Sequence, residues 1–163
     1  MINKVLLGVA LCTAIPLASA TDLNSSELNS SQQISRSGSR ASVSGSSDYF
    51  DGSVRVDPLF SVNDDINASS AYVTFEPGAR SAWHTHPKGQ YLVVISGVGL
   101  TQEWGKPIQE IHPGDVVWCP PGVRHWHGAT PTTSMTHLAV TGSADGKSVQ
   151  WMEKVTDEQY NNR

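Results

Sequence analysis

Cysteine, basic residues and long apolar runs are all scarce in this chain of 163 residues. Its two cysteines are Cys12, in an apolar N-terminal run, and Cys119, which we expect to be a small buried residue on a strand. The 11 lysines and arginines are outnumbered by 15 acidic residues and form no basic stripe. This distribution excludes nucleic acid as a partner, because nothing is arranged to neutralise phosphates.

The first twenty residues have the three parts of a secretory signal. Lys4 supplies a positive start, residues 5–15 are apolar, and Ala18 to Ala20 are small. The apolar run is shorter than the roughly 20 residues that span a bilayer. We therefore expect cleavage after Ala20 and a secreted or periplasmic mature protein with no membrane attachment. Cleavage removes Lys4 and no acidic residue, which changes the formal charge from -4 to -5. Cys119 is then the one remaining cysteine, so no internal disulfide is expected.

Residues 21–47 are rich in serine and show no sustained hydrophobic period. Such a segment buries too little apolar area to offset the entropy of ordering it. We expect a flexible leader over 21–47 and one folded domain over 48–163.

Short β-type runs separated by turn residues fill the rest of the chain, which has 14 Gly and 9 Pro. This spacing leaves no room for βαβ units and predicts an all-β sandwich or barrel. A last edge strand is expected at 149–152 and one helical turn at 156–160. The other expected strands cover residues 54–56, 71–75, 82–86, 90–96, 100–103, 108–111, 116–119, 125–128 and 135–141.

Five of the six histidines lie in these strand-like segments. His84 and His86 are two residues apart, as are His125 and His127, so each pair projects from one face of its strand. His137 lies on the following segment, and the turn 87–89 can bring Gln90 beside the first pair. Burying five imidazoles on one face is costly unless they share a task. Because imidazole is a common ligand of Mn, Fe, Co, Ni, Cu and Zn, the pattern favours a metal site.

The spacing of these histidines resembles the two motifs of the cupin family. The first motif runs from Gly78 to Gly97 and contains His84, His86 and, in place of the usual Glu, Gln90. The second runs from Gly114 through residues 120–122 to His125, and Ala129 replaces the Asn that often closes it. The resemblance implies an all-β, single-domain cupin: a double-stranded β-helix, or jelly-roll barrel. It also implies one divalent metal ion held by His84, His86, Gln90 and His125.

Residues 71–78, 80–87, 114–118, 125–129, 131–133 and 135–137 are similar to bacterial cupin hydroxynitrile lyases, which use manganese to cleave or form cyanohydrins. This resemblance implies that His127 and His137 line the pocket and handle protons. It places the small residues Ala71 and Val73 near the pocket mouth. Relatives tend to carry Gln at the position of Thr141, so substrate positioning at Thr141 is expected to differ.

Three neutral imidazoles and a neutral amide leave the charge of the ion uncompensated, which makes the ion a stronger Lewis acid. An amide oxygen suits hard ions, and no cysteine belongs to the set. We expect Mn, with Fe, Zn or Ni as alternatives.

Two other functions are compatible with the same ligands. One is a cupin dioxygenase that uses Fe(II) or another redox metal, and the other is a non-enzymatic cupin that binds a small ligand. A small molecule is the expected partner in each case. Short strands such as 54–56 leave edges to be covered, so a homo-oligomer, a dimer or tetramer, is also expected.

Overall fold

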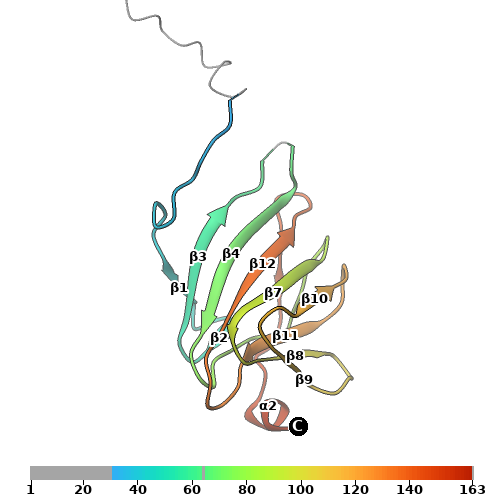
Figure 1. Ribbon diagram of the computed structural model, residues 1–163. Helices are drawn as coiled ribbons and strands as arrows, with labels where there is room; N and C mark the ends of the chain where they lie inside the picture. Colours follow the sequence, from blue (N-terminus) through green and yellow to red (C-terminus); the bar gives the residue numbers. More distant parts are fainter. Residues whose placement is uncertain (1–30, 64, 163) are drawn as a thin grey trace, which may run out of the picture. The chain divides into compact units, whose positions relative to one another are not determined.

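The computed structural model describes residues 31–63 and 65–162 (Figure 1). The predicted signal segment 1–20 and the predicted leader up to residue 30 lie outside the described residues. The chain divides into the units Met1–Ile34 and Ser35–Arg163, and the fold described below is that of the second unit. Within the described residues, no helix is long and apolar enough to cross a membrane.

Strands make up nearly all of the regular structure in the described residues, as predicted for an all-β fold, and they pair in the antiparallel sense. In the same part of the chain one short helix, α2 (Asp157–Asn161), lies near the C-terminus. The strands are β1 (Val43–Ser44), β2 (Phe50–Asp51), β3 (Val54–Phe60), β4 (Ala68–Phe75), β5 (Arg80–Ser81), β6 (His84–Thr85), β7 (Gln90–Gly97), β8 (Gly99–Glu103), β9 (Gln109–Ile111), β10 (Val116–Cys119), β11 (His125–Ala129), β12 (Met135–Gly142) and β13 (Gln150–Trp151).

Two sheets form the domain. The first has the order β1-β3-β4-β12-β7-β10, and these strands lie side by side in Figure 1. The second has the order β13-β6-β11-β5-β2, with β8 also paired to β11 and β9 paired to β8. Because side chains alternate along a strand, one face of each sheet is apolar. The main core contains residues from both sheets: Val54, Val73, Phe75, Ala79, Val94, Ile111, Ala129 and Met135.

A second apolar cluster lies beneath α2. Trp126 of β11 is fully buried there with Trp83, Leu100, Val155 and Tyr160. Thr156 caps the helix through a reciprocal capping box with Gln159. Since Trp126 points into this cluster, its neighbours His125 and His127 point to the opposite face of β11, into the domain interior.

The strand β3 continues through Pro58, beyond the predicted end at residue 56. The N–H of Gly45 donates to the carbonyl of Val54, so the backbone polar groups of Val54 face β1. Because these groups alternate along a strand, those of Pro58, four residues later, face the same side of β3. β1 pairs only with Arg55 and Val56, so β3 is an edge strand at Pro58. The missing N–H of proline therefore removes no ladder hydrogen bond there.

Candidate metal centre

The structure brings five histidines together in the interior of the domain. The exposed fractions are 1% for His84, 3% for His86, 2% for His125, 5% for His127 and 0% for His137. The sixth histidine, His112, lies outside this cluster and pairs with Glu110 at 3.0 Å. The five buried rings are called the histidine cluster below.

Strand pairing sets the distances within the cluster. His84 of β6 lies directly opposite His125 of β11, and their ring centroids are 4.2 Å apart. The His86 ring lies 5.0 Å from that of His84 and 5.3 Å from that of His125. His127, two residues along β11, is 5.3 Å from His84. All four rings thus lie around a common space.

Gln90 reaches the cluster through a tight turn. Gly89, which precedes it, has a φ of 79°, and a Cβ on Gly89 would collide with Trp118. Only glycine fits here, so Gln90 begins β7 immediately after the turn. Its amide nitrogen Nε2 donates to Oγ1 of Thr141 at 2.9 Å. Its oxygen Oε1 is buried and has no hydrogen-bond partner.

The Nδ1 atoms of His84, His86 and His125 each contact a neighbouring group, which leaves Nε2 of these rings for a metal ion. Nδ1 of His84 donates to the carbonyl of Ala82 at 2.9 Å, and Nδ1 of His86 donates to the carbonyl of Ser148 at 2.6 Å. Because a carbonyl only accepts, Nε2 of each neutral ring carries a lone pair. Nδ1 of His125 lies 3.4 Å from Sγ of Cys119. This is the arrangement of metal-binding histidines, whose second nitrogen is held by a neighbouring group.

Three buried atoms of the cluster and its neighbour Gln90 lack hydrogen-bond partners and are potential metal ligands: Nε2 of His86, Oε1 of Gln90 and Nε2 of His125. Leaving polar atoms buried and unpaired is costly, and a bound cation would satisfy all three. The donors are neutral nitrogens and an amide oxygen, which suit a divalent transition metal. The residues present therefore fit such an ion.

A partly different set of three histidines also has the geometry of a metal site. Ligand nitrogens of His84, His125 and His127 all lie within 4.8 Å of one another, so these three could hold an ion. This group shares His84 and His125 with the predicted set but contains His127 instead of His86. We favour the predicted set, because Nε2 of His86 is a buried atom without a hydrogen-bond partner, whereas Nδ1 of His127 is paired with His137.

His127 and His137 form a hydrogen-bonded pair, with Nδ1 of His127 3.2 Å from Nε2 of His137. Phe75 packs against both rings, at centroid distances of 5.5 and 5.8 Å. In this contact one ring nitrogen donates and the other accepts, while Nδ1 of His137 has no hydrogen-bond partner. The arrangement allows a proton to pass from one ring to the other.

Burial lowers the pKa of every ring in the cluster. The pKa is about 3 for His84, about 2 for His125 and about 4 for His137, and that of His127 is well below 6.5. Burial also lowers the pKa of His86, although its hydrogen bond to Ser148 acts in the opposite direction. The rings are therefore neutral at pH 7, the form in which imidazole binds a metal or accepts a proton.

The three predicted pocket residues lie on the inner face of the first sheet. Val73 is paired with His137, Ala71 with Ala139, and Thr141 with Gln90. A cavity of about 240 Å³ borders the cluster at His125, and none of these three residues lines it. Its walls are Thr101, Glu103, Lys106, Pro107, Gln109, Val117, Trp118, Cys119, Pro120, Val123 and His125.

Two neighbours of the cluster were not expected from the sequence. Cys119 was assigned only a packing role, and Ser148 had no role, yet they contact His125 and His86 respectively. The contact from Ser148 is made by its backbone carbonyl, and because every residue has such a carbonyl, the sequence gives no sign of this contact. That from Cys119 depends on β10 pairing with β7, which places Cys119 opposite Gln90.

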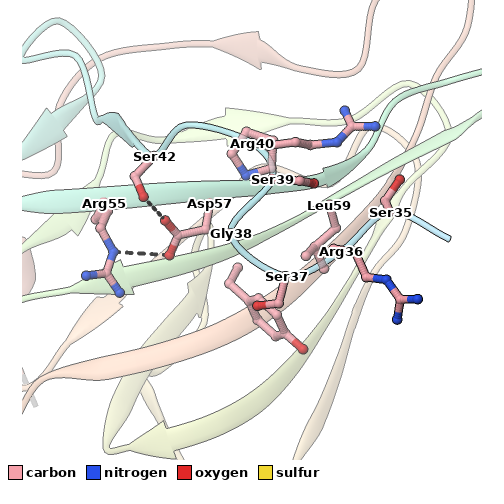
Figure 2. Close-up of a pocket in the computed structure, with 12 residues that line it drawn as sticks. Ser35, Arg36, Ser37, Gly38, Ser39, Arg40, Ser42, Arg55, Asp57 and Leu59 are labelled. Atoms are coloured by element: carbon pink, nitrogen blue, oxygen red, sulfur yellow. Dashed lines mark hydrogen bonds and ion pairs between the residues drawn. The ribbon is translucent and has the colours of Figure 1, made fainter.

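A surface groove of about 560 Å³ lies elsewhere on the second unit, between residues 35–42 and β3 (Figure 2). Asp57 there accepts hydrogen bonds from Ser42 and from Arg55. Its lining contains no histidine and no buried titratable side chain. The chemistry of this chain is therefore expected at the histidine cluster.

Comparison with known proteins agrees with this geometry. Residues 71–141 match the Cupin domain family. The chain is 60% identical over 128 residues to an (R)-mandelonitrile lyase from Granulicella tundricola, covering 78% of this chain and 98% of that one. It is 42% identical to a cupin-like protein of known structure from Thermotoga maritima, with a TM-score of 0.67 over 79% of this chain and 95% of that one.

A cupin-2 domain protein from Rhodospirillum rubrum shares the fold at 20% identity, with a TM-score of 0.60 over 78% of this chain and 83% of that one. The antiparallel sheets, the histidine cluster in their interior and these similarities agree, and the prediction of an all-β cupin barrel is confirmed. The chain belongs to the cupin family.

Proposed function

We propose that this protein is a metal-dependent hydroxynitrile lyase that cleaves or forms cyanohydrins. The observation that carries the proposal is the juxtaposition of three unpaired ligand atoms, on His86, Gln90 and His125, with the hydrogen-bonded pair His127–His137. The first group can hold a Lewis-acidic ion, and the second can move a proton. The 60% identity to a protein named (R)-mandelonitrile lyase supports the same reaction and an aromatic cyanohydrin as substrate.

The proposed ligands are His84, His86, Gln90 and His125, and the proposed metal is Mn(II), with Fe, Zn or Ni as alternatives. An amide oxygen favours hard ions, and the thiol of Cys119 has its pKa raised to about 12 by burial, so it is no ready thiolate ligand. When bound, the ion acts as a Lewis acid that lowers the pKa of a substrate hydroxyl.

The histidine pair supplies the proton transfers. His127 or His137, neutral at pH 7, accepts the proton of the cyanohydrin hydroxyl. The carbon–carbon bond to the nitrile then breaks, its electron pair leaves with cyanide, and the oxygen becomes the carbonyl of the aldehyde. Because burial lowers its pKa, the imidazolium is a better proton donor than an ordinary histidine, so the ring returns the proton to cyanide and releases hydrogen cyanide. In the reverse direction the same steps form a cyanohydrin.

The inner face of the first sheet is the proposed surface for the rest of the substrate. Ala71 and Val73 lie in the strand next to His137, and Thr141 lies beside Gln90. The first two side chains are small and apolar, which suits the hydrocarbon part of a cyanohydrin rather than a charged group.

Elemental analysis of the purified protein, followed by a cyanide-release assay with mandelonitrile, tests this function. We expect about one transition-metal ion per chain and cyanide release that is lost after chelation. His127→Ala and His137→Ala should lose activity and keep the metal, whereas His86→Ala should lose both. Oxygen consumption by the Fe(II) form without cyanide release would identify a dioxygenase. If no metal form turned over either substrate type, the chain would be a binding protein.

We further propose a homo-oligomer that covers the outer face of the first sheet. On this face, Tyr72 of β4, Tyr91 of β7, and Val116 and Trp118 of β10 are 37 to 60% exposed, and β12 lies between β4 and β7. Soluble monomers rarely expose large contiguous apolar patches. Light scattering after size exclusion should report a dimer or tetramer, and Trp118→Lys should shift it toward monomer. If the unaltered chain has the mass of a monomer in solution, this part of the proposal is contradicted.

The proposed location is outside the cytoplasm, by cleavage after Ala20. The three-part pattern of residues 1–20 supports it. Mass spectrometry of protein from the exported fraction should give an N-terminus at Thr21. A cytoplasmic protein that starts at Met1 would contradict it.

A further inference from the structure

The contact between Gln90 and Thr141 joins two neighbouring strands of the first sheet. Gln90 begins β7, and Thr141 lies directly opposite it on β12. Nε2 of Gln90 donates to Oγ1 of Thr141 at 2.9 Å, and the two residues are only 6% and 9% exposed. We propose that Thr141 is a positioning residue that holds the amide of Gln90 with its oxygen toward the metal site. This inference rests on the metal-binding part of the proposed function.

The two ends of the amide differ in what they can bind. The oxygen has lone pairs that can coordinate a cation, whereas the NH₂ group presents protons and is not a ligand. In the observed arrangement Oε1 is buried without a hydrogen-bond partner, as a ligand atom would be before an ion binds. Nε2 points away from the cluster, to the hydroxyl of Thr141. The hydroxyl oxygen of Thr141 therefore accepts a hydrogen bond from the NH₂ group of Gln90, which is the end of the amide that cannot bind the ion.

Without the Thr141 hydroxyl, the metal-binding arrangement of Gln90 has a buried N–H with no acceptor. Leaving a buried donor unpaired is costly. In the metal-free protein the amide has an alternative orientation, because no ion then holds its oxygen. There the NH₂ group can turn and donate to the unpaired Nε2 of His86. The loss of the hydroxyl thus weakens metal binding specifically and leaves the metal-free fold nearly as stable.

Three variants of the full chain separate this role from simple packing. Thr141→Val keeps the shape without the hydroxyl, Thr141→Ala removes hydroxyl and methyl without overpacking, and Thr141→Ser restores the hydroxyl. Thr136→Val is the matched control, since Thr136 lies on the same strand and its hydroxyl is paired with that of Thr74 at 2.9 Å, away from the cluster. Far-UV circular dichroism of each metal-free variant checks that it folds.

The measurement is the dissociation constant for Mn(II), obtained from the electron paramagnetic resonance signal of free Mn(II). Because the outer partners of metal ligands typically contribute 10- to 100-fold in affinity, we expect Thr141→Val and Thr141→Ala to bind about 10- to 100-fold more weakly. Thr141→Ser and Thr136→Val should stay within about threefold of the unaltered protein.

The inference is overturned if Thr141→Val and Thr141→Ala bind Mn(II) as tightly as the unaltered chain, or if Thr141→Ser does not restore affinity. It is also overturned if Thr136→Val weakens binding as much, or if the unaltered chain takes up no Mn(II). If the affinities follow the expected order but neither the unaltered chain nor any variant releases cyanide, the inference on Thr141 is supported and only the proposed lyase reaction is rejected. Failure of the inference and failure of the proposed function are therefore distinguishable.

Discussion

The metal-free protein should lose stability steeply when the pH falls below about 6.5, the pKa of histidine in an unfolded chain. Within the fold, burial lowers the pKa of His84 to about 3, of His125 to about 2 and of His137 to about 4. Between these values and 6.5, the unfolded chain binds protons that the folded chain does not. The contribution of these rings to stability is therefore fully present above pH 6.5 and is lost as the pH is lowered.

The size of the loss follows from the number of rings. At pH 5.5, one unit below the unfolded pKa, each histidine that is neutral in the fold and charged in the unfolded chain costs about 1.4 kcal/mol. His84, His125 and His137 together cost about 4 kcal/mol, and His86 and His127 act in the same direction. Since domains are typically stable by about 5–15 kcal/mol, this loss brings the metal-free protein close to unfolding.

Urea titrations followed by tryptophan fluorescence, with a chelator present at pH 7.5, 6.5 and 5.5, measure this effect. The free energy of unfolding should fall by several kcal/mol between pH 6.5 and 5.5 and much less between 7.5 and 6.5. His112→Asn is the matched control, because it replaces an exposed histidine outside the histidine cluster. A free energy that stays within about 1 kcal/mol from pH 7.5 to 5.5 would refute the reasoning that the cluster is buried and neutral.

Three further predictions concern the surroundings of the cluster. Gln90→Glu adds a negative charge beside the ion, so metal affinity should rise and the rate of cyanide release should fall; faster turnover would contradict the Lewis-acid argument. Cys119→Ala removes the partner of His125 Nδ1, so chelator competition should show affinity reduced by up to about tenfold, and unchanged affinity would exclude a supporting role. Tyr160→Phe removes the hydrogen bond from the Tyr160 hydroxyl to the buried carbonyl of Ala129, at 2.8 Å. Urea denaturation should show a loss of about 1–2 kcal/mol with metal affinity unchanged, and altered affinity would show that α2 influences the site.

Much of the candidate site was predictable because its determinants are local. The alternation of a strand puts His125 and His127 on one face, and Gly89 forces the turn that brings Gln90 next to His86. The short strands and the turn residues between them predicted an all-β fold for the same reason. Each inference used only residues within a few positions of one another.

The tertiary structure decided which groups support these side chains. Thr141 meets Gln90, Cys119 meets His125 and the carbonyl of Ser148 meets His86 because of strand register and loop placement across 51, 6 and 62 positions. Likewise, β3 runs through Pro58 only because β1 ends before it. The sequence by itself thus determined the residue types and local spacing of the candidate metal site. Long-range pairing decided the orientation of each donor atom, since hydrogen bonds between distant strands depend on a register that no local pattern specifies.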